Sequence, residues 1–62
     1  MFTIVIWKEE GGFIGRVKEV PLLGQLKSAN WELLVKLFKE EIQFLVKDRP
    51  DLQSTLIRVS FE

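Results

Sequence analysis

The sequence contains no cysteine and no histidine among its 62 residues. The absence of cysteine excludes disulfide bonds, and the absence of both residue types removes the usual ligands of a structural zinc ion. A chain of this length buries only about 60% of the surface that its unfolded form exposes, so its core is marginal. Oligomerisation remains as a further source of burial, and we expect a homo-oligomer, either a dimer or a larger assembly.

The same two absences limit the chemistry of the chain. Histidine is the most frequent general base and the cysteine thiolate a frequent nucleophile. The acidic pairs Glu9-Glu10 and Glu40-Glu41 are adjacent in sequence, and adjacent side chains on a helix do not converge on one metal ion or substrate atom. Gly11-Gly12 lacks the spacing and the following lysine of a phosphate-binding loop. We predict that the protein is not an enzyme and has no catalytic, cofactor-binding or metal-binding residues.

Neither sign of charge is in excess, because nine Lys and Arg residues balance nine Asp and Glu residues. A neutral chain creates no strong non-specific field for DNA or for an anionic membrane. Long apolar runs are also absent: the segment from Met1 to Trp7 is followed at once by Lys8, far short of the ~20 residues of a membrane span. It also lacks the basic flank of a signal peptide. We therefore expect a cytoplasmic protein without a membrane partner.

The residues that are present predict three strands, a helix and a fourth strand. The first segment is apolar at both alternating positions, which is typical of a central strand covered on both faces. Glu9 to Gly12 supplies the turn to an antiparallel second strand, and Pro21 ends that strand. Alternation returns near the C-terminal end. The expected strands cover residues 2–7, 13–20, 22–27 and 55–61.

The helix is predicted from residue spacing and from its terminating signals. Ser28 and Asn30 are both candidate N-caps, and Pro50 favours an end at about Lys47. At 100° per residue one apolar stripe forms, which we expect to cover a sheet. This stripe consists of Trp31, Leu34, Val35, Phe38, Ile42, Leu45 and Val46. A second apolar cluster, on a neighbouring side of the helix, consists of Leu33, Leu37 and Phe44.

A strand–helix–strand connection within one sheet is almost always right-handed, so the last strand most simply lies parallel to the first. The prediction is a single α+β domain over residues 1–62, with sheet order 3-2-1-4 and the helix on one face. The opposite face would display more apolar surface than a monomer usually carries. The residues expected there are Val5, Trp7, Ile14 and Leu56, beside Arg16, Lys18 and Arg58.

These exposed residues have two interpretations. In the first, they form protein interfaces, with the basic residues as a rim; the candidate interface residues are Val5, Trp7, Ile14, Leu33, Leu37, Phe44 and Leu56. In the second, Trp7 stacks on bases while Arg16, Lys18 and Arg58 hold phosphates of a nucleic acid. We prefer the first, since the chain has no net positive charge and lacks the aromatic-rich pattern of sheet-type RNA binders. For the helix cluster, burial against residues 48–54 is an equal alternative.

Four segments carry a family resemblance. They are Thr3-Ile4-Val5-Ile6, Glu10-Gly11-Gly12-Phe13, Glu19-Val20-Pro21, and the helix positions Trp31, Val35, Phe38 and Ile42. With these segments the chain resembles the HicB family, the antitoxins of HicA–HicB toxin–antitoxin systems, from residue 2 to about residue 46. The resemblance implies a partial ribonuclease H-like fold and a non-enzymatic domain that self-associates. It also implies, for an antitoxin, a small basic ribonuclease toxin as the protein partner.

Overall fold

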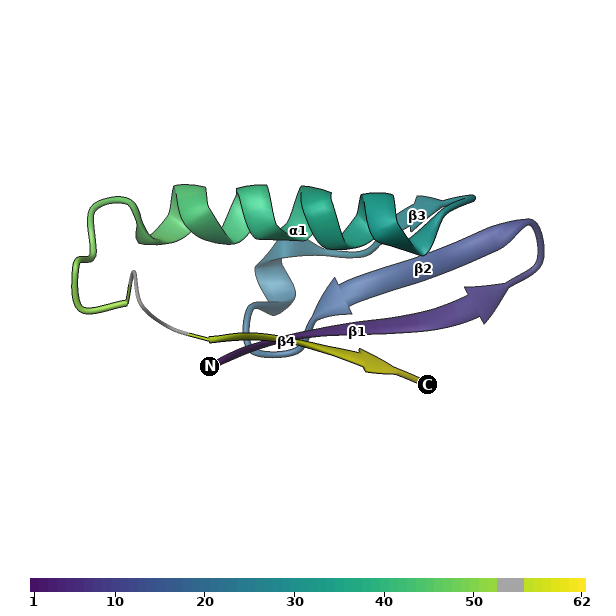
Figure 1. Ribbon diagram of the computed structural model, residues 1–62, viewed down its shortest axis with the longest axis horizontal. Helices are drawn as coiled ribbons and strands as arrows, with labels where there is room; N and C mark the ends of the chain where they lie inside the picture. Colours follow the sequence, from purple (N-terminus) through teal and green to yellow (C-terminus); the bar gives the residue numbers. More distant parts are fainter. Residues whose placement is uncertain (53–55) are drawn as a thin grey trace.

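A computed structural model describes residues 1–52 and 56–62 of the chain. Its four strands form one mixed sheet in the order β3-β2-β1-β4, and one long helix covers a single face (Figure 1). The predicted α+β fold and strand order are therefore confirmed. The elements are β1 (Phe2–Glu9), β2 (Gly12–Val17), the 3₁₀ helix η1 (Pro21–Leu23), β3 (Leu26–Ser28), α1 (Trp31–Val46) and β4 (Ile57–Phe61).

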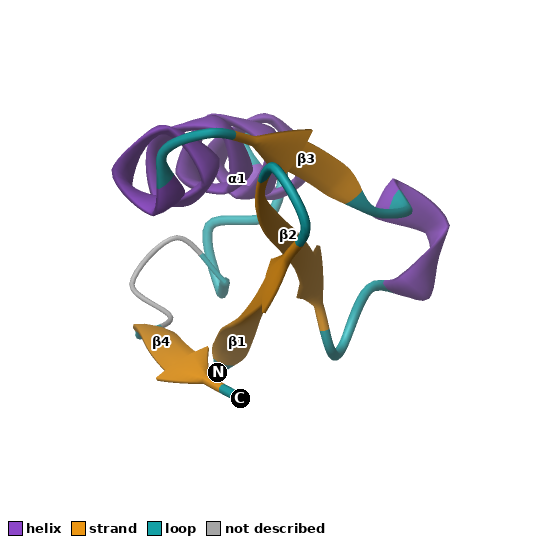
Figure 2. Cartoon of the chain, turned by 90° about the vertical axis from the view of Figure 1, so that its right-hand side faces the viewer, coloured by secondary structure: helices purple, strands orange, loops and turns teal. Residues whose placement is uncertain are grey.

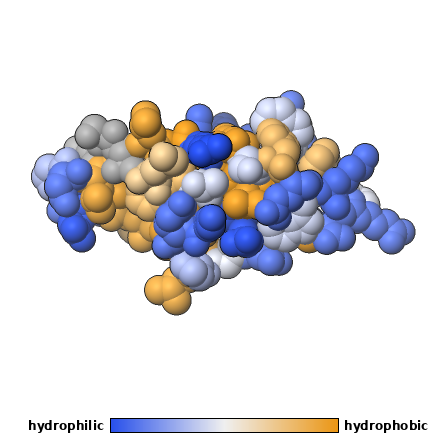
Figure 3. Space-filling view, turned by 90° about the horizontal axis from the view of Figure 1, so that it is seen from below, coloured by the Kyte–Doolittle hydropathy of each residue, from blue (hydrophilic) through white to orange (hydrophobic). Residues whose placement is uncertain are grey.

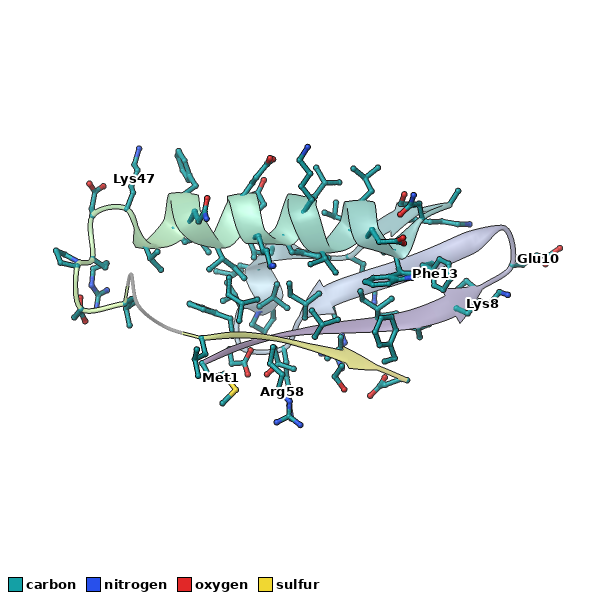
Figure 4. The ribbon with its side chains drawn as sticks, in the orientation of Figure 1. Met1, Lys8, Glu10, Phe13, Lys47 and Arg58 are labelled. Carbon is teal, nitrogen blue, oxygen red and sulfur yellow. The ribbon has the colours of Figure 1, made fainter. Side chains whose placement is uncertain are left out.

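The central strand β1 fixes which residues share a face. It pairs antiparallel with β2 and parallel with β4, so that Ile4 lies opposite Val17 on one side and Val59 on the other. Because registered residues of neighbouring strands point to the same face, these three side chains lie on the helix side of the sheet. Phe13 points into the layer between sheet and helix, whereas Arg58 points away from the helix (Figure 4).

The core lies between α1 and this face of the sheet. Its buried members are Ile4, Ile6 and Val17 from the sheet and Leu34, Phe38 and Ile42 from the helix. Gly15 of β2 makes room for the helix, since a Cβ at this position would lie 2.9 Å from Cε2 of Phe38. A close approach of helix and strand thus depends on the missing side chain of this glycine.

The helix begins at the second of its two candidate N-caps. The side chain of Asn30 accepts a hydrogen bond from the N–H of Leu33 at 3.2 Å, which satisfies one of the free amides of the first turn. The Ser28 hydroxyl instead accepts from the N–H of Asn30, also at 3.2 Å. Both candidates therefore act at the same helix terminus, and Asn30 is the cap.

The third strand differs from its predicted range of 22–27. Residues 21–23 form η1, in which Pro21 supplies a fixed φ at the first position and its carbonyl accepts from the N–H of Gly24. Gly24 then takes a positive φ of 71°. Strand β3 therefore starts only at Leu26 and is three residues long.

The predicted core stripe is correct at five of its seven positions and wrong at the other two. Leu34, Phe38, Ile42 and Val46 are buried and Val35 packs against the core, but Trp31 and Leu45 are exposed. The reason is the position of α1, which packs mainly on β2 and β3 and leaves β4 at the opposite margin (Figure 2). The last strand begins at Ile57, and the predicted start at residue 55 lies outside the described residues.

Candidate functional site

The open sheet face, defined here as the face turned away from α1, does not display Val5 as the sequence predicted. Val5 is only 4% exposed. Its registered neighbours are Arg16 in β2 and Ser60 in β4, and Thr3 and Trp7 flank it on the same face of β1. Side chains on all four sides therefore cover this central position, and Val5 offers no surface to a partner.

The other apolar residues predicted for this face lie in two places. Trp7 and Ile14 are registered partners across β1 and β2, and both are half-buried. The indole Nε1 of Trp7 donates to Glu9 Oε1 at 3.1 Å, which holds the ring on the face. Leu56 is 74% exposed but precedes β4, at the end of the sheet where Phe2 begins β1. Trp7 and Leu56 are thus about 20 Å apart along β1 and do not form one patch.

Acidic groups interrupt the basic residues of the open sheet face. Arg58 lies opposite Thr3, and Thr3 donates from its N–H (2.6 Å) and its hydroxyl (2.9 Å) to the carboxylate of Glu19, next to Lys18. The backbone N–H bond has the largest effect and lowers the pKa of Glu19 below its ordinary value; partial desolvation opposes this, and the hydroxyl bond adds to it. Figure 3 views this side of the molecule and shows hydrophilic residues dispersed among apolar ones.

The outer helix cluster consists of Leu33, Leu37 and Phe44. Leu33 and Phe44 are exposed, the latter at 66%, and Leu37 is half-buried. The ammonium group of Lys47 lies 4.3 Å from the centroid of the Phe44 ring, a cation–π geometry. The described part of the 48–54 segment leaves Leu33 and Phe44 exposed, so the surface of this cluster is open to a partner.

A third apolar surface, which we call the β4 margin, was missed at the level of sequence. The rings of Trp31 and Phe61 meet edge to face, with centroids 5.1 Å apart and planes at 88°. Phe61 is nevertheless 57% exposed. Periodicity assigned Trp31 to the buried stripe of the helix, and the signal against this was its position as the first residue of α1.

Within residues 1–52 and 56–62 the structure contains no pocket and no group of three or more His, Cys, Asp or Glu side chains placed to hold a metal ion. In the same part of the chain, no helix has the length and apolar character needed to cross a membrane. Comparisons of the chain with protein-family models, with curated proteins and with solved structures find no match.

Proposed function

We propose that the chain is a non-enzymatic, HicB-like interaction protein of the cytoplasm, with a partial ribonuclease H-like fold. In this proposal it associates with itself and binds a small protein partner such as a ribonuclease toxin. The resemblance of residues 2–46 to antitoxins supports the choice of partner. The observation that carries the proposal is the exposure of large apolar side chains on two separate surfaces of a very small domain.

These two surfaces are the outer helix cluster and the β4 margin. Leu33 and Phe44 are exposed on the first, and Trp31 and Phe61 on the second. The accessible surface of the chain is 4487 Å², whereas a compact monomer of its 7.3 kDa would have about 4,200 Å². Large apolar side chains gathered on one surface are typical of sites that associate with other proteins.

Two carboxylates flank the outer helix cluster, where the Lys47 ammonium also lies over the Phe44 ring. At about 100° per residue, Glu40 and Glu41 lie on the two sides of the arc that holds Leu33, Leu37 and Phe44. A small basic protein could place its apolar residues on the cluster and its cations beside these carboxylates. On the open sheet face, by contrast, Glu9 and Glu19 stand among the basic residues, which weakens that face as a site for phosphates.

The test is to isolate the tagged protein from its own host cells at low salt and to identify what binds in stoichiometric amount. We expect a small basic protein that cleaves RNA by itself and is inhibited when this chain is added. The double variant Leu33→Lys with Phe44→Lys should lose this partner. The control is Leu22→Lys, since Leu22 lies on η1 and is 98% exposed, and it should keep the partner. Nuclease-sensitive nucleic acid in place of a protein would contradict the proposal.

A further inference from the structure

We propose that the free edge of β4 pairs antiparallel with β4 of a second copy of the chain, so that two four-stranded sheets join into one. This inference rests on the self-association included in the proposed function and assigns its geometry. The partner of this edge is therefore the chain itself, while the outer helix cluster stays available on each protomer.

The two edges of the sheet are not equivalent. β3 is three residues long, ends two residues before α1 and carries Lys27. β4 has five residues, and within the described part of the chain its only neighbour in the sheet is β1. No described element lies beyond it in Figures 1 and 2. Short length, proline and charged side chains are among the usual devices that protect an edge from pairing. β4 has no proline and is longer than β3, and its one charged residue, Arg58, lies opposite Ser60 of the second copy in the register argued below.

The backbone groups on this edge can be assigned from the hydrogen bonds on the other side of β4. The N–H of Phe2 donates to the carbonyl of Leu56 at 3.0 Å, and the N–H of Glu62 donates to the carbonyl of Ile6 at 2.8 Å. Because the direction of backbone groups alternates along a strand, residues 56, 58, 60 and 62 face β1. The N–H and C=O groups of Ile57, Val59 and Phe61 therefore face outward.

One register satisfies all of these outward groups. When the twofold axis passes through Val59, each Val59 lies opposite Val59 of the other copy. Ile57 of each copy then lies opposite Phe61 of the other copy. Each such pair exchanges two backbone hydrogen bonds. An axis at Arg58 would leave Phe61 without a strand partner and would place two arginines directly opposite each other, which is destabilising. The axis at Val59 instead places Arg58 opposite Ser60 of the second copy.

The side chains support the same register. Ile57 and Val59 are half-buried, and Phe61 is exposed beside Trp31 on the helix side of the sheet. Pairing would bring Phe61 onto Ile57 of the second copy and would set the two Val59 side chains side by side. An aromatic residue opposite a β-branched residue is a favourable cross-strand pair. The apolar surface of the β4 margin would thus be covered by the same event that satisfies the edge.

A mixed cross-linking experiment tests this register, because the chain has no cysteine of its own. Arg58 and Ser60 of the second copy form a non-hydrogen-bonded pair with Cα atoms about 4.5 Å apart, which suits a disulfide. Two Arg58 residues, or two Ser60 residues, are diagonal neighbours at about 7–8 Å, which is too far. We expect Arg58→Cys and Ser60→Cys chains to form disulfide-linked dimers when mixed and oxidised, and neither to do so alone.

A charge series at the same position gives a second, independent readout. Ser60→Arg faces Arg58 of the second copy and should weaken the dimer at least tenfold at low salt, whereas Ser60→Glu should strengthen it severalfold. Thermal unfolding of each variant at a concentration where it is monomeric separates effects on folding from effects on association. If the wild type dimerises but the mixture yields no cross-link and the charge series has no effect, the β4 pairing is wrong while self-association stands. A wild type that never dimerises contradicts both.

Discussion

The ring of Phe38 lies directly over Gly15, and a Cβ on that glycine would come within 2.9 Å of Cε2 of the ring. Phe38 is fully buried, with no accessible surface of its own. The ring therefore cannot turn into solvent to make room, and the distance between α1 and β2 is set by this pair. The positions of the side chains on the outer side of α1, including Leu33 and Phe44, therefore depend on the packing of Phe38 against Gly15.

Replacing Gly15 by alanine should destabilise the fold by about 1–3 kcal/mol, because the added methyl group overpacks the core. Chemical denaturation monitored by circular dichroism measures the loss. In a Phe38→Leu background, whose smaller side chain leaves space, the same Gly15→Ala change should cost much less. Equal costs in the two backgrounds would show that the methyl group does not meet the ring.

The lowered pKa of Glu19 predicts how the stability of the fold changes with pH. Its pKa is lowered in the folded state, chiefly by the N–H of Thr3, so its ionised form stabilises the fold. This contribution is fully present above the ordinary pKa of a glutamate and is lost as the pH falls through the lowered value. Glu19→Gln should therefore be less stable than wild type at pH 7, by under about 1 kcal/mol because the group is solvent-screened.

The difference between the two proteins should shrink as the pH is lowered from 7 into the acidic range where Glu19 becomes protonated. Thermal unfolding at closely spaced pH values measures it. Glu10→Gln is the matched control, because Glu10 lies in the β1–β2 turn, and its difference from wild type should not follow the same curve. If the difference in stability between wild type and Glu19→Gln stayed constant down to the lowest pH, the role assigned to the Thr3 hydrogen bonds would be refuted.

Asn30 gives a test of the helix start. Asn30→Ala removes the acceptor for the Leu33 N–H and should cost about 1 kcal/mol of unfolding free energy. Asn30→Ser keeps an oxygen that can accept the same bond and should cost a few tenths of a kcal/mol at most. Denaturant midpoints of the three proteins measure this order. If alanine and serine were equally harmful, the side-chain cap would not be what stabilises this terminus.

The sheet order could be predicted from the sequence because strong local patterns agree with it. Residues 2–7 are apolar on both faces, which places β1 in the centre, and handedness then fixes β4 beside it. The stretch at Pro21 misled the prediction, since Leu22 and Leu23 read as strand residues although proline and the following glycine close a 3₁₀ turn. Hydrophobicity alone does not distinguish these two conformations.

The candidate surfaces were less predictable, because exposure depends on neighbours that periodicity does not place. Val5 was expected at the surface and is buried by the registered residues around it. Trp31 was expected in the core and is exposed, because α1 lies over β2 and β3 rather than over β4. In the outer helix cluster, Leu33 and Phe44 are exposed and Leu37 is half-buried, and the role of the cluster as an interface stays a prediction.

Sedimentation velocity of the untagged wild-type chain tests the central claim, that this small domain covers its apolar surface by association. Measured from about 1 μM to about 1 mM, a range that spans weak to moderate affinities, the average mass should rise from 7.3 kDa towards twice that value. Such a rise would show that the chain associates with itself, as its exposed apolar surfaces predict. A constant mass of 7.3 kDa at every concentration would contradict the account.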